Sequence, residues 1–159
     1  MATEKLKFKL EIYSTYFTKP PIVEIKIEDN SYFNKEITST EKQPTVIEFE
    51  HDCENDKTYT LNLIRSGKTI RDTVVKDNKI IADQMLYLKY IEIDEIDLGA
   101  LIYEGVYTPI YNEPWASQQA EAGIKLPKTI KNSPSMGHNG TWAFTFTSPF
   151  YMWLLEHLY

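Results

Sequence analysis

The chain has 159 residues, a length that suits one domain with a sizeable core. Its formal net charge is −6 and no basic cluster is visible, which argues against a nucleic-acid binder, because phosphate contacts require a basic face. It has no apolar run near the ~20 residues of a membrane span, and Cys53 is its single cysteine, so an internal disulfide is excluded.

The first hundred residues carry the pattern of an all-β sandwich. Polar and apolar residues alternate along short segments, as in strands with one buried face. Turn-forming residues, including Pro20-Pro21 and the segment 29–31, separate these segments every ~8–12 residues. The predicted strands cover residues 5–12, 22–28, 46–49, 58–64, 69–75, 85–96 and 100–107.

The pattern changes after Thr108. Residues 109–140 contain four prolines and three glycines and predict a long ordered loop, with one helical turn over 116–122. Loops of this length are usually functional or wrapped on a partner. Residues 140–147 return to strand alternation. We therefore expect one domain made of a sandwich module (1–108), the long loop (109–140) and a closing strand with a terminal helix (141–159).

The last segment predicts a short helix that is apolar on nearly every side. Ser148 is a favourable N-cap, and Pro149 suits the first helical position. Such a helix needs more than one buried side. Either the long loop covers it, or it docks onto another protein or a second copy of this chain. The predicted partner interface consists of Phe150, Tyr151, Trp153, Leu154, Leu155 and Tyr159.

Residues suited to catalysis are sparse. The three histidines have no metal-binding spacing, and Cys53, two residues after His51, has the features of an ordinary thiol. Asp94, Glu95 and Asp97 could act as the paired carboxylates of a glycosidase, but a solvated turn after a strand explains them as well. We therefore predict a protein that is not an enzyme, with no catalytic residues.

A second acidic group suggests a cation site. Asp72, Asp77 and Asp83 lie in and after a predicted β-loop, together with Asn78. Oxygen ligands on a loop suit a hard cation such as calcium. These three aspartates are the candidate metal ligands.

The segment 77–88 resembles the calcium-dependent xylan-binding modules, in which an acidic loop runs into an Asp-Arg-Asn-Leu-Tyr-Val-like strand. Here Asp-Gln-Met-Leu-Tyr-Leu occupies that place at 83–88, and the strand at 58–64 is similar to the His-x-Leu-x-Val-type strand of the family. The resemblance covers roughly residues 5–97 and implies a jelly-roll β-sandwich. It further implies a calcium ion that coordinates sugar hydroxyls directly.

On this resemblance, Asp77 and Asp83 match the calcium ligands of the family, and Asn78 and Gln84 are the candidate carbohydrate-binding residues. The sequence departs from the family where Gln84 and Met85 replace the Arg-Asn pair and where the loop lacks the usual glycines. The fold could therefore be kept while the calcium and sugar site is lost.

The whole chain also resembles short virion structural proteins of large tailed phages, in the segments 93–97, 107–109, 139–142 and 148–156. The main expectation is therefore a virion component, used for decoration, tail or adsorption, which contacts other virion proteins or itself. It would be made in a host cytoplasm, because the N-terminus lacks a signal-peptide run. The alternatives are a calcium-dependent carbohydrate-binding module that recognises surface glycans and a glycosidase. Nucleic-acid and membrane partners are not expected.

Overall fold

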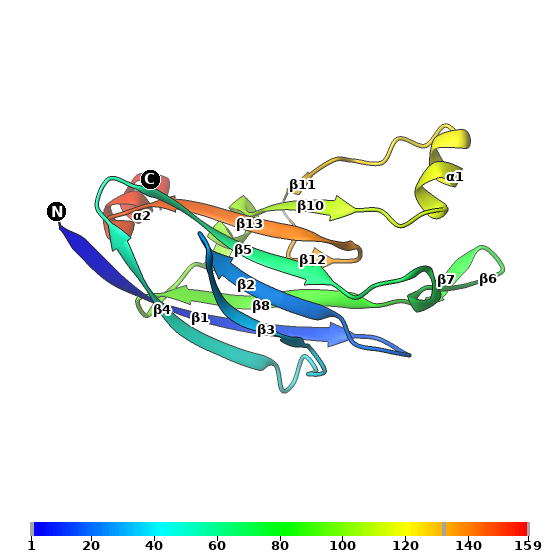
Figure 1. Ribbon diagram of the computed structural model, residues 1–159, viewed down its shortest axis with the longest axis horizontal. Coiled ribbons are helices and arrows are strands. Elements are labelled where there is room, and N and C mark those ends of the chain that lie inside the picture. The colour runs from blue at the N-terminus through cyan, green and yellow to red at the C-terminus, as the bar shows by residue number, and fades with distance from the viewer. Residues whose placement is uncertain (1, 132, 159) are drawn as a thin grey trace.

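The computed structural model describes residues 2–131 and 133–158, which form two antiparallel sheets packed face to face (Figure 1). The first sheet has the order β12 (Ser135–Met136), β8 (Met85–Ile93), β1 (Thr3–Thr15), β4 (Thr45–Glu54), with β9 (Ile96–Asp97) paired to β8. The second has the order β11 (Ile130–Lys131), β10 (Val106–Ile110), β13 (Asn139–Thr147), β5 (Thr58–Ser66), β2 (Ile22–Ile27), β3 (Asn30–Glu36).

Shorter elements complete the described chain. A separate hairpin joins β6 (Val74–Lys76) to β7 (Lys79–Ala82). Two 3-10 helices, η1 (Ile70–Asp72) and η2 (Gly99–Glu104), and two α-helices, α1 (Trp115–Glu121) and α2 (Phe150–Leu158), lie between or after the strands. Neither α-helix of this described part has the length or the apolar character needed to cross a membrane. The prediction of an all-β, jelly-roll-like sandwich with a short C-terminal helix is confirmed.

The core follows directly from the alternation in the sequence. Every second residue of β1 between Leu6 and Ile12 is buried, and the same holds for the inward positions of β2, β5 and β13. Side chains from the two inner faces fill the space between the sheets, as in other sandwiches. The alternate aromatic residues of β13 are all buried: Trp142, Phe144 and Phe146.

Several local predictions were wrong. The expected strand 69–75 is η1 followed by β6, because Asp72 and Thr69 form a capping box that starts a helical turn. The expected strand 100–107 is η2 followed by β10. Asn30 and Ser31, predicted as a turn, begin β3, while the turn lies one step earlier, where Glu28 has a φ of 55°.

The two ends of the sandwich differ. The first and last described residues lie at one end, together with α2 (Figure 1). The opposite end carries the β6–β7 hairpin and α1. We call it the loop end and define it as residues 65–84 and 111–139.

Helix α2 is fastened to the first strand. The Oε2 atom of Glu4 accepts hydrogen bonds from the backbone nitrogen of Phe150 at 2.7 Å and from the hydroxyl of Ser148 at 2.5 Å. Ser148 therefore donates to Glu4, and the Glu4 carboxylate caps the helix in place of the predicted Ser148 side chain. An anionic cap also suits the positive end of the helix dipole.

Candidate functional site

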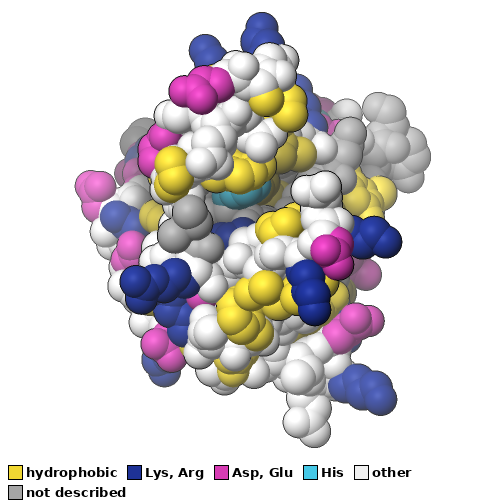
Figure 2. Space-filling view, turned by 90° about the vertical axis from the view of Figure 1, so that its right-hand side faces the viewer, with side chains coloured by type: hydrophobic (Ala, Val, Ile, Leu, Met, Phe, Trp, Pro, Cys, Tyr) yellow, Lys and Arg dark blue, Asp and Glu magenta, His cyan; other side chains and the backbone are white. Residues whose placement is uncertain are grey.

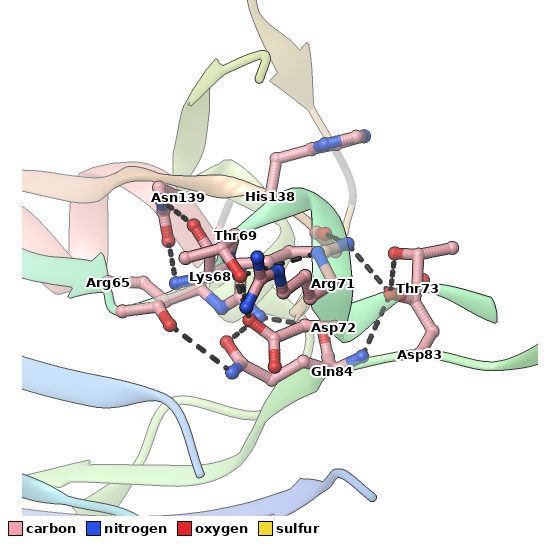
Figure 3. Close-up of polar contacts among 12 residues, drawn as sticks. Arg65, Lys68, Thr69, Arg71, Asp72, Thr73, Asp83, Gln84, His138 and Asn139 are labelled. Atoms are coloured by element: carbon pink, nitrogen blue, oxygen red, sulfur yellow. Dashed lines mark hydrogen bonds and ion pairs between the residues drawn. The ribbon is translucent and has the colours of Figure 1, made fainter. Parts of the chain in front are cut away.

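Buried charge is concentrated at the loop end (Figure 3). The buried polar side chains of the described residues include Arg65, Lys68, Asp72 and Gln84, all from one segment of twenty residues. Burying charge is costly unless each charge finds a partner. The contacts of this cluster therefore determine what the loop end can bind.

Lys68 and Asp83 form the central ion pair. The Lys68 Nζ lies 2.7 Å from Oδ1 of Asp83, and the same oxygen accepts from the Thr73 hydroxyl at 2.6 Å and the Gln84 backbone nitrogen at 2.8 Å. Burial alone would raise the pKa of Asp83, but these hydrogen bonds and the Lys68 charge lower it. Lys68 Nζ also donates to the carbonyl of Gly137. Within the described residues no hydrogen bond reaches Oδ2 of Asp83, which leaves an acceptor free.

Arg65 belongs to the same cluster and is 1% exposed. Its Nη2 donates to the carbonyl and to the side-chain oxygen of Gln84, at 2.6 and 2.9 Å. Its Nε and Nη1 have no hydrogen-bond partner in the described part of the chain. Burial lowers the pKa of this guanidinium. Arg65 is therefore a buried cation with two nitrogen atoms that donate to no described residue.

Asp72 is held by its own loop. Its Oδ2 accepts from the backbone nitrogen of Thr69 at 2.7 Å, and its Oδ1 accepts from the Thr18 hydroxyl at 2.9 Å. Lys19 lies 3.8 Å from the carboxylate. Burial raises the pKa of Asp72, but the Thr69 and Thr18 hydrogen bonds outweigh it, so the net shift is downward.

Three rings from the predicted long loop form an aromatic wall, which we define as Tyr111, Trp115 and His138. The His138 ring stacks on Trp115 with 5.4 Å between centroids and meets Tyr111 edge-on at 4.8 Å. The hydroxyl of Tyr107 accepts from the His138 backbone nitrogen at 2.9 Å and donates to its carbonyl, which fixes the backbone below the ring. Burial, followed by the charges of Lys68 and Arg65, lowers the pKa of His138.

The wall borders a hollow in the surface. Figure 2 looks onto the loop end and shows a depression between the α1 segment above and the β6–β7 hairpin below, with a histidine on its floor. His51 pairs in register with Leu6 near the start of β1, and His157 belongs to α2, so the histidine of this end is His138. Lys or Arg atoms lie just beneath it. The hollow thus combines apolar rings with charged groups.

The three predicted calcium ligands do not meet. Asp77 lies on the exposed β6–β7 turn, while Asp72 and Asp83 are engaged by threonine and lysine side chains. Among residues 2–131 and 133–158 there is no group of three or more His, Cys, Asp or Glu side chains able to hold a metal ion. This arrangement does not fit a calcium ion, because its carboxylates already have protein partners or stand apart.

The two predicted sugar-binding residues have different surroundings. Asn78 is exposed on the β6–β7 turn with a φ of 63°. Gln84 is fully buried, and its side chain bonds to Arg65 and, at 3.1 Å, to the carbonyl of Lys19. Gln84 therefore supports the loop end from inside and cannot touch a ligand in this conformation.

The predicted interface residues of α2 divide between core and surface. Phe150 and Leu154 are buried and Trp153 is half-buried, so these side chains pack on the sandwich. Tyr151 and Leu155 are exposed, as is the neighbouring Met152. Tyr159 lies outside the described residues.

The other candidates for catalysis have structural roles. Asp94, on an exposed turn, accepts from the Lys7 backbone nitrogen, and Asp97, at the exposed end of β9, accepts from the Gly99 backbone nitrogen, both at 2.8 Å. Cys53 is buried, and burial raises the pKa of its thiol to about 12. Its sulfur contacts the carbonyl of His51, not the imidazole ring. These contacts match the solvated-turn interpretation of Asp94 and Asp97 and the ordinary-thiol interpretation of Cys53.

Sequence reasoning missed the groups that form the hollow. Tyr111, Trp115 and His138 lie in a segment whose local pattern shows only a proline-rich loop, and Arg65 and Lys68 fall between the predicted strands 58–64 and 69–75. Two aromatic residues on a long predicted loop were the available signal, since binding residues concentrate on loops. The contacts of Lys68 with Gly137 and Asn139 join segments about seventy residues apart, which the sequence does not bring together.

No family model matches the chain, and no curated protein matches it. Two solved structures share its general outline. One is described as the SeMet form of vCBM60, in work on two families of calcium-dependent carbohydrate binding modules; it is 9% identical, with a TM-score of 0.49, over 87% of this chain and 89% of that chain. The other is vCBM60 in complex with galactobiose, 10% identical, with a TM-score of 0.46, over 87% and 96%. Values this low transfer no residue and no ligand.

Proposed function

We propose that this chain is a non-catalytic carbohydrate-binding module and that the hollow at the loop end is its binding site. The observation that carries this proposal is the link between the aromatic wall and the Lys68–Asp83 pair: Lys68 Nζ donates to the carbonyl of Gly137, the residue before His138. A pyranose ring has an apolar C–H face and a rim of hydroxyls. It is bound well by a site with flat aromatic surface and a few convergent polar groups.

The hollow contains both kinds of group. Trp115 and Tyr111 are half-buried, so each keeps ring surface available for stacking. The free Oδ2 of Asp83 can accept a hydrogen bond from a sugar hydroxyl. The ring nitrogens of His138, which bond to no other described residue, can donate or accept.

The site is also preorganised. Lys68 binds Asp83 and the Gly137 carbonyl, and its backbone exchanges two hydrogen bonds of 2.9 Å with the Asn139 side chain. These contacts hold the loops on both sides of the hollow in one arrangement before any ligand arrives. Binding then costs less conformational entropy.

Glycan-array screening, followed by calorimetric titration of the best ligand, tests the proposal. We expect binding to at least one oligosaccharide, and Trp115→Ala should weaken it by roughly tenfold or more, as for other buried aromatic anchors. Tyr151→Ala removes an exposed ring at the opposite end and should leave affinity unchanged. The proposal fails if no glycan binds at millimolar concentration, or if Trp115→Ala binds as well as the parent protein.

We also propose a second role, as a structural component that assembles through α2, such as a virion protein. It is favoured by Tyr151, Met152 and Leu155, whose side chains are 59%, 57% and 40% exposed on one short helix. Grouped exposed apolar side chains of this kind commonly mark interaction sites. The two roles are compatible, since α2 lies at the end of the sandwich opposite the hollow (Figure 1).

A further inference from the structure

We propose that the glycan bound in the hollow is anionic, bearing carboxylate or sulfate groups that lie on the Lys68 side of the aromatic wall. This inference rests on the proposed function and narrows its ligand class. Three features of the loop end support it: the charge distribution, the pairing of each charged group and the buried guanidinium of Arg65.

The loop end has the opposite charge to the rest of the chain. Residues 65–84 and 111–139 contain eight Lys or Arg against five Asp or Glu, a net charge of +3. Since the whole chain carries −6, the remaining residues carry −9. Dark blue Lys and Arg side chains surround the hollow on several sides in Figure 2. A basic end on an acidic protein attracts anions to that end.

Two of the five acidic side chains of the loop end form ion pairs. Asp83 is paired with Lys68, and Asp72 lies within ion-pair distance of Lys19. The exposed Arg71 forms no ion pair with any described carboxylate, and the same is true of the exposed lysines of this end. The positive charge of the loop end is therefore largely uncompensated.

Arg65 adds a charge that water cannot screen. It is 1% exposed, and none of the described carboxylates lies within 4 Å of it. Charges act more strongly through a protein interior than through solvent. The pKa of His138, on the floor of the hollow, is lowered by burial and then by Lys68 and Arg65, with Asp83 opposing. Among the charges that act on His138, two cations thus face one carboxylate, an arrangement that suits an anion beside the ring.

The test compares ligands that share a backbone and differ in charge. Polygalacturonic acid is titrated against its fully methyl-esterified form, and dextran sulfate against dextran, which separates carboxylate from sulfate as the anionic group. We expect one charged member to bind about tenfold or more tightly than its neutral partner at low salt, because charge-assisted hydrogen bonds are roughly twice as strong as neutral ones. We expect the difference to shrink in 0.5 M salt.

Substitutions at single basic residues test which side chain causes the preference for charged ligands. Lys68→Gln should abolish the discrimination between the charged and neutral ligands, and Lys68→Arg should retain it. Lys35→Gln removes an exposed lysine from β3, away from the hollow, and is the control for non-specific attraction. If Lys68→Gln melts before binding can be measured, Arg71→Gln provides the second variant, with a partial loss expected.

The outcomes separate the two proposals. Equal or better binding of the neutral member of every pair overturns the anionic ligand while the carbohydrate-binding module stands. If Lys35→Gln and Lys68→Gln lose the same amount of affinity for the charged ligand, the inference is also overturned. The attraction would then come from the general charge of the surface and not from the hollow. If no charged or neutral glycan binds, the proposed function fails, and this inference fails with it.

Discussion

The Nζ of Lys68 lies 2.7 Å from Oδ1 of Asp83, and the same nitrogen donates to the carbonyl of Gly137. One side chain therefore joins the loop after β5, the segment that leads into β8 and the turn before β13. His138 of the aromatic wall lies in the last of these segments. Loss of the Lys68–Asp83 contact should therefore make the loops around the hollow more mobile and also lower the stability of the fold.

The ion pair predicts a measurable loss of stability. Asp83→Asn leaves the nearly buried Lys68 ammonium without its counter-charge, and removing one partner of a buried pair costs about 3 kcal/mol. Asp77→Asn, at an exposed turn position, is the matched control and should change the free energy of unfolding by less than about 0.5 kcal/mol. Urea denaturation measures both. A loss of similar size in the two variants would contradict the structural role of Asp83.

The same carboxylate should make stability depend on pH. Asp83 and Asp72 both have a pKa that is lower in the folded protein than in the unfolded chain. Their ionised forms therefore stabilise the fold above the unfolded value of about 3.9, and this contribution is lost as the pH falls through the folded pKa. Thermal melts from pH 7 to pH 2.5 should show a smaller decrease for Asp83→Asn than for the parent protein. Parallel curves would contradict this assignment.

Calcium should have little effect. Asp72 and Asp83 are already held by threonine and lysine groups, and Asp77 stands apart on the hairpin turn. A specific ion that binds only the folded state stabilises it by mass action. We expect no shift of the melting temperature between EDTA and millimolar calcium. A rise of several degrees that disappears in Asp77→Asn would show that the hairpin rearranges to build the metal site that the sequence resemblance implies.

The exposed face of α2 predicts self-association. Replacing Tyr151, Met152 and Leu155 with serine should convert any oligomer to monomer in sedimentation velocity experiments, while Phe150 and Leu154 keep the helix packed on the sandwich. The control replaces Ile80 and Ile81, which are exposed to a similar extent on β7, with serine. A monomeric parent protein, or an oligomer that survives in the triple variant, would rule out this face as a self-interface.

Removal of the Glu4 cap should destabilise α2 locally. Glu4→Ala removes the acceptor of two hydrogen bonds, one of them from the first residue of α2, and should cost about 2 kcal/mol, because hydrogen bonds to charged groups are the stronger ones. Hydrogen exchange should show faster exchange in α2 before the strands are affected. Glu48→Ala, at an exposed position in β4, is the control. Unchanged protection of α2 would mean that the packing of Phe150 and Leu154 alone holds the helix.

The strands were predictable because their signal is local. Alternation in residues 5–12, 22–28, 58–64 and 140–147 reports which side chains face the other sheet, and burial follows it. The signal failed where polar residues occupy inward positions. The strand predicted at 46–49 continues to Glu54, with His51 and Cys53 both facing inward.

The hollow could not be predicted in the same way. Gln84 resembles a sugar-binding residue in sequence, yet its partners are Arg65 and the carbonyl of Lys19, which only the fold brings together. Likewise, nothing near Trp115 in the sequence indicates that His138 stacks on it. A local pattern reports burial, whereas a binding site depends on which loops meet at one end of the sandwich.

The hydrogen bonds between Glu4 and the start of α2 also determine at which end of the molecule an attachment would lie. The first strand and the last helix are joined at one end of the sandwich (Figure 1). A tag, surface or fusion partner linked to either terminus would therefore lie at the end away from the hollow. A tethered copy would then present the aromatic wall outward, toward whatever surface it approaches. Display on a large particle or on an immobilised support should therefore add avidity without obstructing the site.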